Sequence, residues 1–148
     1  MSSGDEVSTD YHTVFDVLRG ATKRIFPNAT EAESTNTESL QSFVSNGYTI
    51  GNNSGTNGNG DSYVSWNWLA NGAGSSNTDG SINTTYTSVN TTAGFSISTY
   101  TGTGSNATIG HGLGAVPQMV IARNITDAEQ WTTYHVGLDA TAPQNYHV

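Results

Sequence analysis

The sequence predicts an all-β fold, an antiparallel β-sandwich of jelly-roll or lectin-like character with long Asn/Thr/Gly-rich loops. Ser, Thr and Asn make up about a third of the chain and Gly contributes 17 of 148 residues, a composition that disfavours helices and favours turns. Thr, Val, Ile and the aromatic residues supply strand formers that pack well on a pleated surface. Short apolar stretches alternate with polar residues, at the period of half-buried strands.

Composition also limits the classes of function. Intrinsic disorder is the rival interpretation, but three Trp and seven Tyr residues argue for a packed core. The 12 acidic and 4 basic residues give a net charge of −8, which opposes association with phosphate backbones, so no nucleic-acid partner is expected. The chain has no cysteine, which excludes disulfides and thiolate metal sites. No apolar stretch is long enough for a secretory signal or a bilayer span, so no membrane insertion is expected.

The first block of the chain, residues 10–70, follows a polar leader at residues 1–9. Apolar residues between positions 11 and 26 fit either an amphipathic helical turn or two strands joined by a turn, and two strands are favoured. Farther along, the stretch LQSFVSNGYTIG predicts a β-hairpin around Asn46-Gly47. Apolar residues precede this turn pair, and Tyr48 and Ile50 alternate with polar residues after it.

The stretch YVSWNWLA, residues 63–70, gives the clearest strand signal in the chain. Val64, Trp66 and Trp68 alternate with polar residues and therefore share one strand face. We expect Trp66 and Trp68, together with Trp131, to lie in the core. The alternative is that such rings form a platform for sugars, which stack on flat aromatic faces.

Residues 71–93 contain almost nothing to bury and read as a flexible linker, the best domain boundary in the chain. The second block, residues 94–148, offers three strand candidates separated by Gly-rich turns, within 94–104, 106–114 and 116–124. The last has the continuous apolar run of a buried strand. Neither block can bury its apolar residues alone, because a single sheet needs a partner layer.

His111, in the stretch IGHGLGAVP, admits two interpretations. It could serve as a ligand or as an acid–base group. Alternatively, its ring nitrogen binds the backbone of a turn in which Gly112 and Gly114 adopt positive φ and Pro117 starts the next strand. The structural interpretation is favoured, because no second catalytic group stands at a fixed short spacing. No catalytic residue is assigned.

Two further groups of polar residues could bind a metal. His135 and His147 flank Asp139, but the twelve-residue separation of the histidines lacks the spacing that places two ligands on one face. The loop NGNGDS, residues 57–62, mimics the oxygen ligands of a calcium loop but lacks the bidentate glutamate that should follow. Chance spacing and an Asn-Gly turn explain these patterns better, so neither a metal nor a cofactor is predicted.

Recognition of a family rests on GFSISTYTG at residues 94–102, HGLGAVP at residues 111–117 and WTTYH at residues 131–135. These motifs resemble a repeated β-rich domain in the tail and other virion proteins of bacteriophages, particularly marine ones. The first block resembles the back half of the same unit. The resemblance implies the back half of one sandwich unit at 10–70, a linker, and the front half of the next at 94–148. The favoured interpretation is that the chain is a fragment of a longer fibre protein. Alternatively, the halves would close on each other or on neighbouring chains by strand exchange.

The expected function follows from this resemblance. It implies a non-enzymatic component of the virion, assembled in the host cytoplasm and extracellular in the particle. We expect a tail-fibre or appendage module that contributes to attachment to host-surface glycans, with Tyr63, Tyr100 and Tyr134 as candidate ligand-binding residues. The alternative is a purely structural, self-associating module such as a capsid decoration or spacer domain. Its partners would be copies of itself as a homo-oligomer and other virion proteins, with host polysaccharide as a further candidate.

A third hypothesis is a polysaccharide depolymerase. It would require carboxylates that face each other across a groove. Most of the glutamates fall within residues 31–38, in the acidic connector of the first block, and this disfavours an enzyme.

Overall fold

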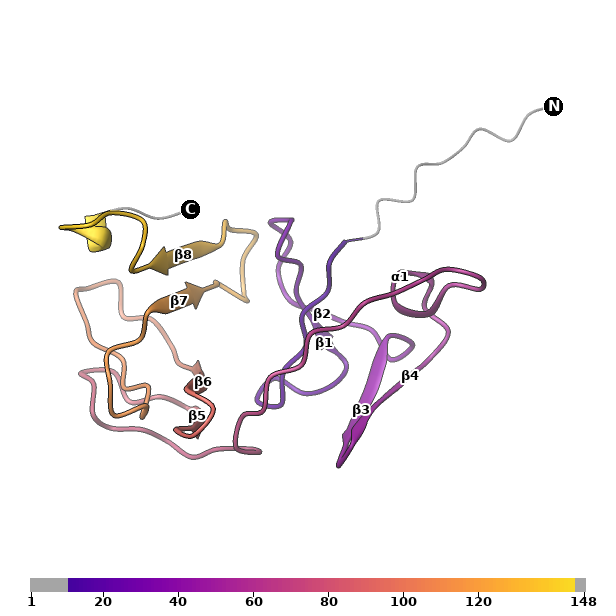
Figure 1. The fold of residues 1–148 in the computed structure, drawn as a ribbon, viewed down its shortest axis with the longest axis horizontal. Helices are drawn as coiled ribbons and strands as arrows, with labels where there is room; N and C mark the ends of the chain where they lie inside the picture. The colour runs from indigo at the N-terminus through magenta and orange to yellow at the C-terminus, as the bar shows by residue number, and fades with distance from the viewer. Residues whose placement is uncertain (1–10, 146–148) are drawn as a thin grey trace. The chain divides into compact units, whose positions relative to one another are not determined.

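The computed structural model describes residues 11–145, and nearly all of its regular structure is β (Figure 1). The elements in chain order are β1 (Lys23–Arg24), β2 (Ser34–Thr35), β3 (Leu40–Val44), β4 (Gly47–Ile50), α1 (Ser54–Asn57), β5 (Tyr86–Asn90), β6 (Phe95–Thr99), β7 (Met119–Ala122), β8 (Thr132–His135) and η1 (Pro143–Asn145). The predicted all-β class is confirmed. The polar leader expected at residues 1–9 lies outside the described residues.

The strands form four antiparallel sheets of two strands each, β1–β2, β3–β4, β5–β6 and β7–β8. Each strand has at most five residues, and each sheet pairs two strands that are consecutive in the chain (Figure 1). Within the described residues, no sheet extends beyond two strands. No helix within residues 11–145 is long and apolar enough to cross a bilayer.

The chain divides into two compact units, each assembled from separate segments. In the described residues, the first unit contains 11–15, 21–63 and 123–131, and the second contains 16–20, 64–122 and 132–145. The blocks expected at 10–70 and 94–148 each contribute to both units. The structural division therefore differs from the division along the sequence that we expected.

In the first unit, the backbone around Val14 and Ile25 forms an antiparallel bridge. Each residue donates its amide to the carbonyl oxygen of the other, at N–O distances of 2.9 and 3.2 Å. The intervening turn includes Gly20 at φ +103°, a conformation that glycine adopts without steric cost. The strand–turn–strand alternative for residues 11–26 is thus the one that forms, although regular pairing is short.

The predicted hairpin at residues 40–51 is confirmed by the pairing of β3 with β4. Val44 pairs with Gly47, so the turn residues are Ser45 and Asn46, one position earlier than expected. Neither turn residue has a positive φ, whereas an Asn-Gly turn of the usual hairpin type needs positive φ at both positions. Leu40 begins the hairpin and is 7% exposed, in the small apolar core that also contains Ile25.

The prediction of a flexible linker over residues 71–93 is wrong, because this stretch contains β5. The strand pairs with β6 in continuous register, from Tyr86 with Thr99 to Asn90 with Phe95. Composition misled the prediction, because the buried side chains here are hydroxyl-bearing rather than apolar. Hydrogen bonds satisfy these polar side chains, which makes their burial tolerable.

A chain of hydroxyl groups forms the buried centre of the second unit. Thr84 Oγ1 accepts a hydrogen bond from the Asn77 amide at 2.8 Å and lies 2.9 Å from Thr87 Oγ1. The Thr87 hydroxyl in turn lies 2.9 Å from Ser98 Oγ, across the β5–β6 ladder. Ser88, which is fully buried, accepts a hydrogen bond from a loop amide through its Oγ atom. These contacts connect β5, β6 and the loop before them.

The prediction that Trp66 and Trp68 lie in the core is wrong. Residues 63–70 form no strand, and each of these two indole side chains is 69% exposed. Alternation predicts one shared strand face for these two rings, but the stretch that carries them forms no strand. The Trp68 ring packs near Phe95, with ring centroids 6.2 Å apart and planes 21° from parallel.

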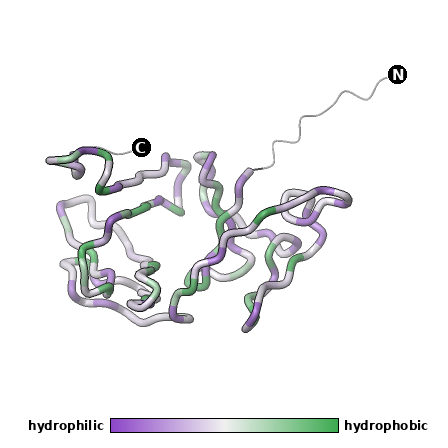
Figure 2. The backbone as a smooth tube through the Cα atoms, in the orientation of Figure 1, coloured by the Kyte–Doolittle hydropathy of each residue, from purple (hydrophilic) through white to green (hydrophobic). Residues whose placement is uncertain are grey.

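The candidate strand at 116–124 forms as β7, but its predicted burial is wrong. Met119, Val120 and Ile121 are 52%, 45% and 54% exposed. Neighbouring residues of a strand point to opposite faces, so both faces of this part of β7 are uncovered. Figure 2 shows the apolar colouring of this strand. Of the other two candidates, 94–104 contains β6 and 106–114 contributes only a parallel bridge between Ile109 and Ile82.

Candidate binding surfaces

The His111 turn lies in the second unit, between β6 and β7. Gly112 and Gly114 adopt φ values of +71° and +72°. His111 Nδ1 accepts a hydrogen bond from the Leu113 amide at 3.1 Å, so a neutral ring carries its proton on Nε2. Ser96 Oγ donates to the His111 carbonyl at 2.8 Å and ties the turn to β6. These contacts give His111 a structural part in the turn. Pro117, expected to start the next strand, precedes β7 by two residues.

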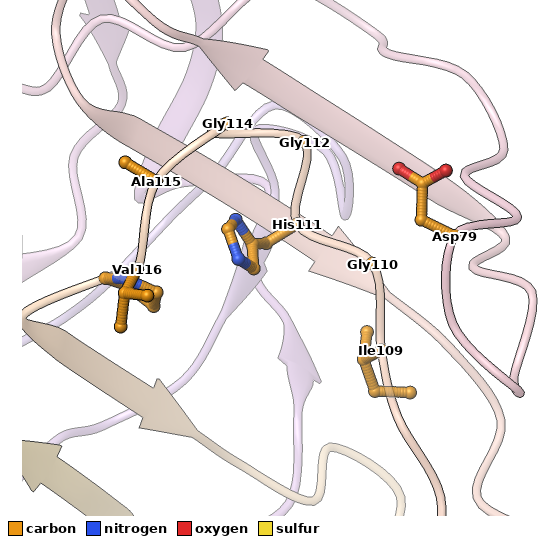
Figure 3. Close-up of a pocket in the computed structure, with 9 residues that line it drawn as sticks. Asp79, Ile109, Gly110, His111, Gly112, Gly114, Ala115 and Val116 are labelled. Atoms are coloured by element: carbon orange, nitrogen blue, oxygen red, sulfur yellow. The ribbon is translucent and has the colours of Figure 1, made fainter.

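A hollow of about 640 Å³ adjoins this turn. Figure 3 shows the His111 ring beside the turn backbone and Val116, with Asp79 on a separate segment. The lining residues are Asp79, Ile109, Gly110, His111, Gly112, Gly114, Ala115, Val116 and Pro117. Asp79 already accepts a bond from the side chain of Asn77 at 3.2 Å. The hollow offers a carboxylate and an imidazole N–H to a polar ligand but brings no hydroxyl or thiol nucleophile beside them.

The three candidate ligand-binding tyrosines are divided between the two units. Tyr63 belongs to the first unit, whereas Tyr100 and Tyr134 belong to the second. The Tyr63 hydroxyl is already occupied, because it donates to the Ser54 carbonyl at 2.5 Å and accepts from the Gly58 amide at 2.8 Å. Tyr100 is 46% exposed, and Tyr134 is half-buried on β8.

The candidate metal ligands make turn contacts instead. His135 Nδ1 accepts from the Gly137 amide at 3.0 Å, and His147 lies outside the described residues. Backbone amides of Ala142 and Thr141, with the Thr141 hydroxyl, bind Asp139 and hold the pKa of its carboxyl below the usual range. Within residues 11–145, no cluster of three or more His, Asp or Glu side chains is arranged to hold a metal ion.

The first unit contains a second hollow, which sequence reasoning missed. Its volume is about 300 Å³, and its lining residues are Pro27, Asn28, Ala29, Thr30, Gln130 and Trp131. Two segments about a hundred positions apart in the chain thus meet here. The only sequence signal was Trp131 itself, and it carried no information about which distant segment would face it.

Contacts around Trp131 fix the indole in place. Its Nε1 donates to the Phe26 carbonyl at 2.8 Å, and the Arg123 guanidinium lies over the ring, 5.6 Å from the centroid. Arg123 Nη2 also donates to the Thr30 and Glu31 carbonyls, both at 2.7 Å. Trp131, expected in the core, is half-buried, and it is the least exposed of the three tryptophans.

Together these features define an all-β chain with a hydroxyl-rich core in one unit and uncovered aromatic and aliphatic side chains in both. The chain belongs to a family described as a domain of unknown function (DUF7483), which matches residues 4–147. No curated protein and no solved structure matches the chain. One family domain therefore spans both of the blocks expected from the sequence.

Proposed function

We propose that the chain is a non-enzymatic structural module of a bacteriophage virion, part of a tail fibre or related appendage, that works as an assembly of copies of itself. One observation carries the assembly: in residues 11–145 the buried apolar side chains are Ile25 and Leu40, whereas 19 large apolar or aromatic side chains are exposed. Covering one such side chain contributes about 1.5–3 kcal/mol. The motifs at 94–102, 111–117 and 131–135 support the virion part of the proposal.

The β7–β8 sheet is the best candidate for the surface between copies. Met119 and Ile121 point to one face and Val120 to the other, and each of the three is about half exposed. Each strand also leaves one edge without a ladder partner in the described residues, and open edges are templates for pairing with another chain. A second copy could satisfy both the apolar faces and an edge.

Native mass spectrometry and sedimentation test this function. We expect the wild type to have a mass several times the 15.6 kDa of one chain, and Ile121→Glu to shift it toward the single-chain mass. The substitution places an unpaired charge in the interface, which is strongly unfavourable. Thr103→Glu, which adds the same charge on an exposed loop of the second unit, should leave the assembly intact. A wild type that is folded and monomeric would refute the proposal.

Attachment to host-surface polysaccharide is the second candidate function. It is favoured by Trp66 and Trp68, whose exposed rings flank the amide of Asn67 in a stretch without charged residues. Flat rings cover the apolar faces of sugars, while amides bind hydroxyl groups. Many weak contacts of this kind become strong when an assembly presents many copies.

Adsorption of the assembled protein to bacterial cells or immobilised polysaccharide tests this function. The double variant Trp66→Ala/Trp68→Ala should bind at least about thirtyfold more weakly, since loss of even one anchoring tryptophan costs about 2 kcal/mol. Exposed Tyr86→Ala in the same unit serves as the control and should keep wild-type binding. Equal adsorption by the double variant and the wild type, at equal mass, would rule out these tryptophans as the contact.

A further inference from the structure

We propose that the Trp131 hollow of the first unit binds one neutral sugar ring of a polysaccharide. The inference deepens the second candidate function, on which it rests, by assigning a site in the first unit, whereas Trp66 and Trp68 belong to the second. It starts from the size of the hollow. About 300 Å³ lies at the lower end of the range for small-molecule pockets, roughly 300–1,000 Å³, and suits a single ring rather than an extended cofactor.

The lining has the two kinds of group that recognise a sugar. Trp131, Pro27 and Ala29 provide apolar surface, and Asn28, Thr30 and Gln130 provide side-chain amides and a hydroxyl. An indole covers the C–H face of a pyranose, while amide groups can both donate to and accept from its hydroxyls. Asn28 Oδ1 already accepts from the His12 amide at 3.1 Å, which leaves its Nδ2 group to donate to a ligand.

The indole is held in place before a ligand arrives. Its Nε1 bond to the Phe26 carbonyl fixes one edge of the ring, and the Arg123 guanidinium covers it at 5.6 Å. Arg123 also donates to the carbonyls of Thr30, which lines the hollow, and of Glu31, so one side chain holds both segments that form the hollow. A rigid aromatic surface reduces the entropy that binding must overcome.

The charge distribution selects a neutral ligand. None of the six lining residues is ionisable. Arg123 is not among them, and its Nε and Nη1 atoms are buried without a hydrogen-bond partner in the described residues. Its positive charge is therefore held under the indole rather than presented in the hollow. With a net charge of −8, the chain as a whole also disfavours acidic polysaccharides.

Titration of the full chain with methyl β-glucoside, methyl α-mannoside and N-acetylglucosamine tests the site. The signals to follow are the three indole N–H resonances in proton–nitrogen NMR spectra, assigned by elimination with Trp66→Phe and Trp68→Phe. We expect at least one sugar to shift the Trp131 resonance. Gln130→Ala should weaken that binding about fivefold, the effect of losing one neutral hydrogen bond. Gln118→Ala, on an exposed position of the second unit, should bind like the wild type.

The outcomes separate this site from the two functions proposed above. An unmoved Trp131 resonance with all three sugars, or equal binding by Gln130→Ala and the wild type, would overturn the inference. Shifts confined to Trp66 and Trp68 would overturn it as well, while leaving polysaccharide attachment standing. The mass of each sample, measured in parallel, reports on assembly independently of any sugar.

Discussion

Replacing Gly74 with alanine is expected to destabilise the second unit by about 3 kcal/mol or more. Gly74 adopts φ +66°, where an alanine costs about 1–2 kcal/mol. A Cβ atom at this position would also lie within 2.5 Å of the Thr87 carbonyl carbon and 2.8 Å from the Ser88 nitrogen, both in the backbone of β5. Backbone cannot rotate away as a side chain can, so the loop and the strand must separate, which adds about 1–3 kcal/mol.

Urea unfolding followed by circular dichroism measures this loss, and Gly72→Ala is its matched control. Gly72 adopts a similar φ of +60°, but a Cβ atom there would meet no atom within 4 Å. Gly72→Ala should therefore lower the free energy of unfolding only by the cost of placing an alanine at positive φ, about 1–2 kcal/mol. Equal losses for the two variants would show that the loop does not pack against β5 in the way described.

Replacing Thr84 with valine is expected to cost about 2 kcal/mol of unfolding free energy. Valine keeps the shape and the branched Cβ but removes the oxygen that accepts from the Asn77 amide and contacts the Thr87 hydroxyl. Thr84 is 2% exposed, so water cannot replace the lost partner. Leaving a buried polar group without a partner costs about 1–3 kcal/mol.

Thr85→Val provides the comparison for the buried hydroxyl. Thr85 is exposed and adjoins Thr84, and the bond that it makes to the Thr99 carbonyl uses its backbone amide. This variant should change stability by no more than about 0.5 kcal/mol. If thermal or urea unfolding gives the same loss for both variants, the hydroxyl chain does not stabilise the unit. An unchanged stability in Thr84→Val would lead to the same conclusion.

The strands that could be predicted from the sequence are those whose signal is local. Alternation of apolar residues and a nearby turn located the β3–β4 hairpin. Gly-rich turns on either side marked the segment of β6, and a continuous apolar run marked β7. The predictions of which side chains are buried were wrong. Alternation predicts that Trp66 and Trp68 share a face, but a covering layer must come from distant residues, and within residues 11–145 both side chains stay 69% exposed.

The chain of buried hydroxyl groups in the second unit could not be predicted from the sequence for a related reason. Thr84, Thr87 and Ser88 are residues that usually lie at the surface, and their burial depends on hydrogen-bond partners brought together by the fold. The same holds for the Trp131 hollow, because Arg123 finds its partners some 93 residues earlier in the chain. Such long-range pairing leaves no periodicity in a single sequence.

The bond from Trp131 Nε1 to the Phe26 carbonyl spans 105 positions of the chain and has a consequence for folding kinetics. Closing so long a loop costs entropy that grows slowly with length, about 0.6 kcal/mol for each doubling, but the search for the contact is slow. During synthesis the first unit cannot be completed until position 131 has left the ribosome. Until then, its apolar surface is open to other chains, and rapid assembly would protect it from aggregation.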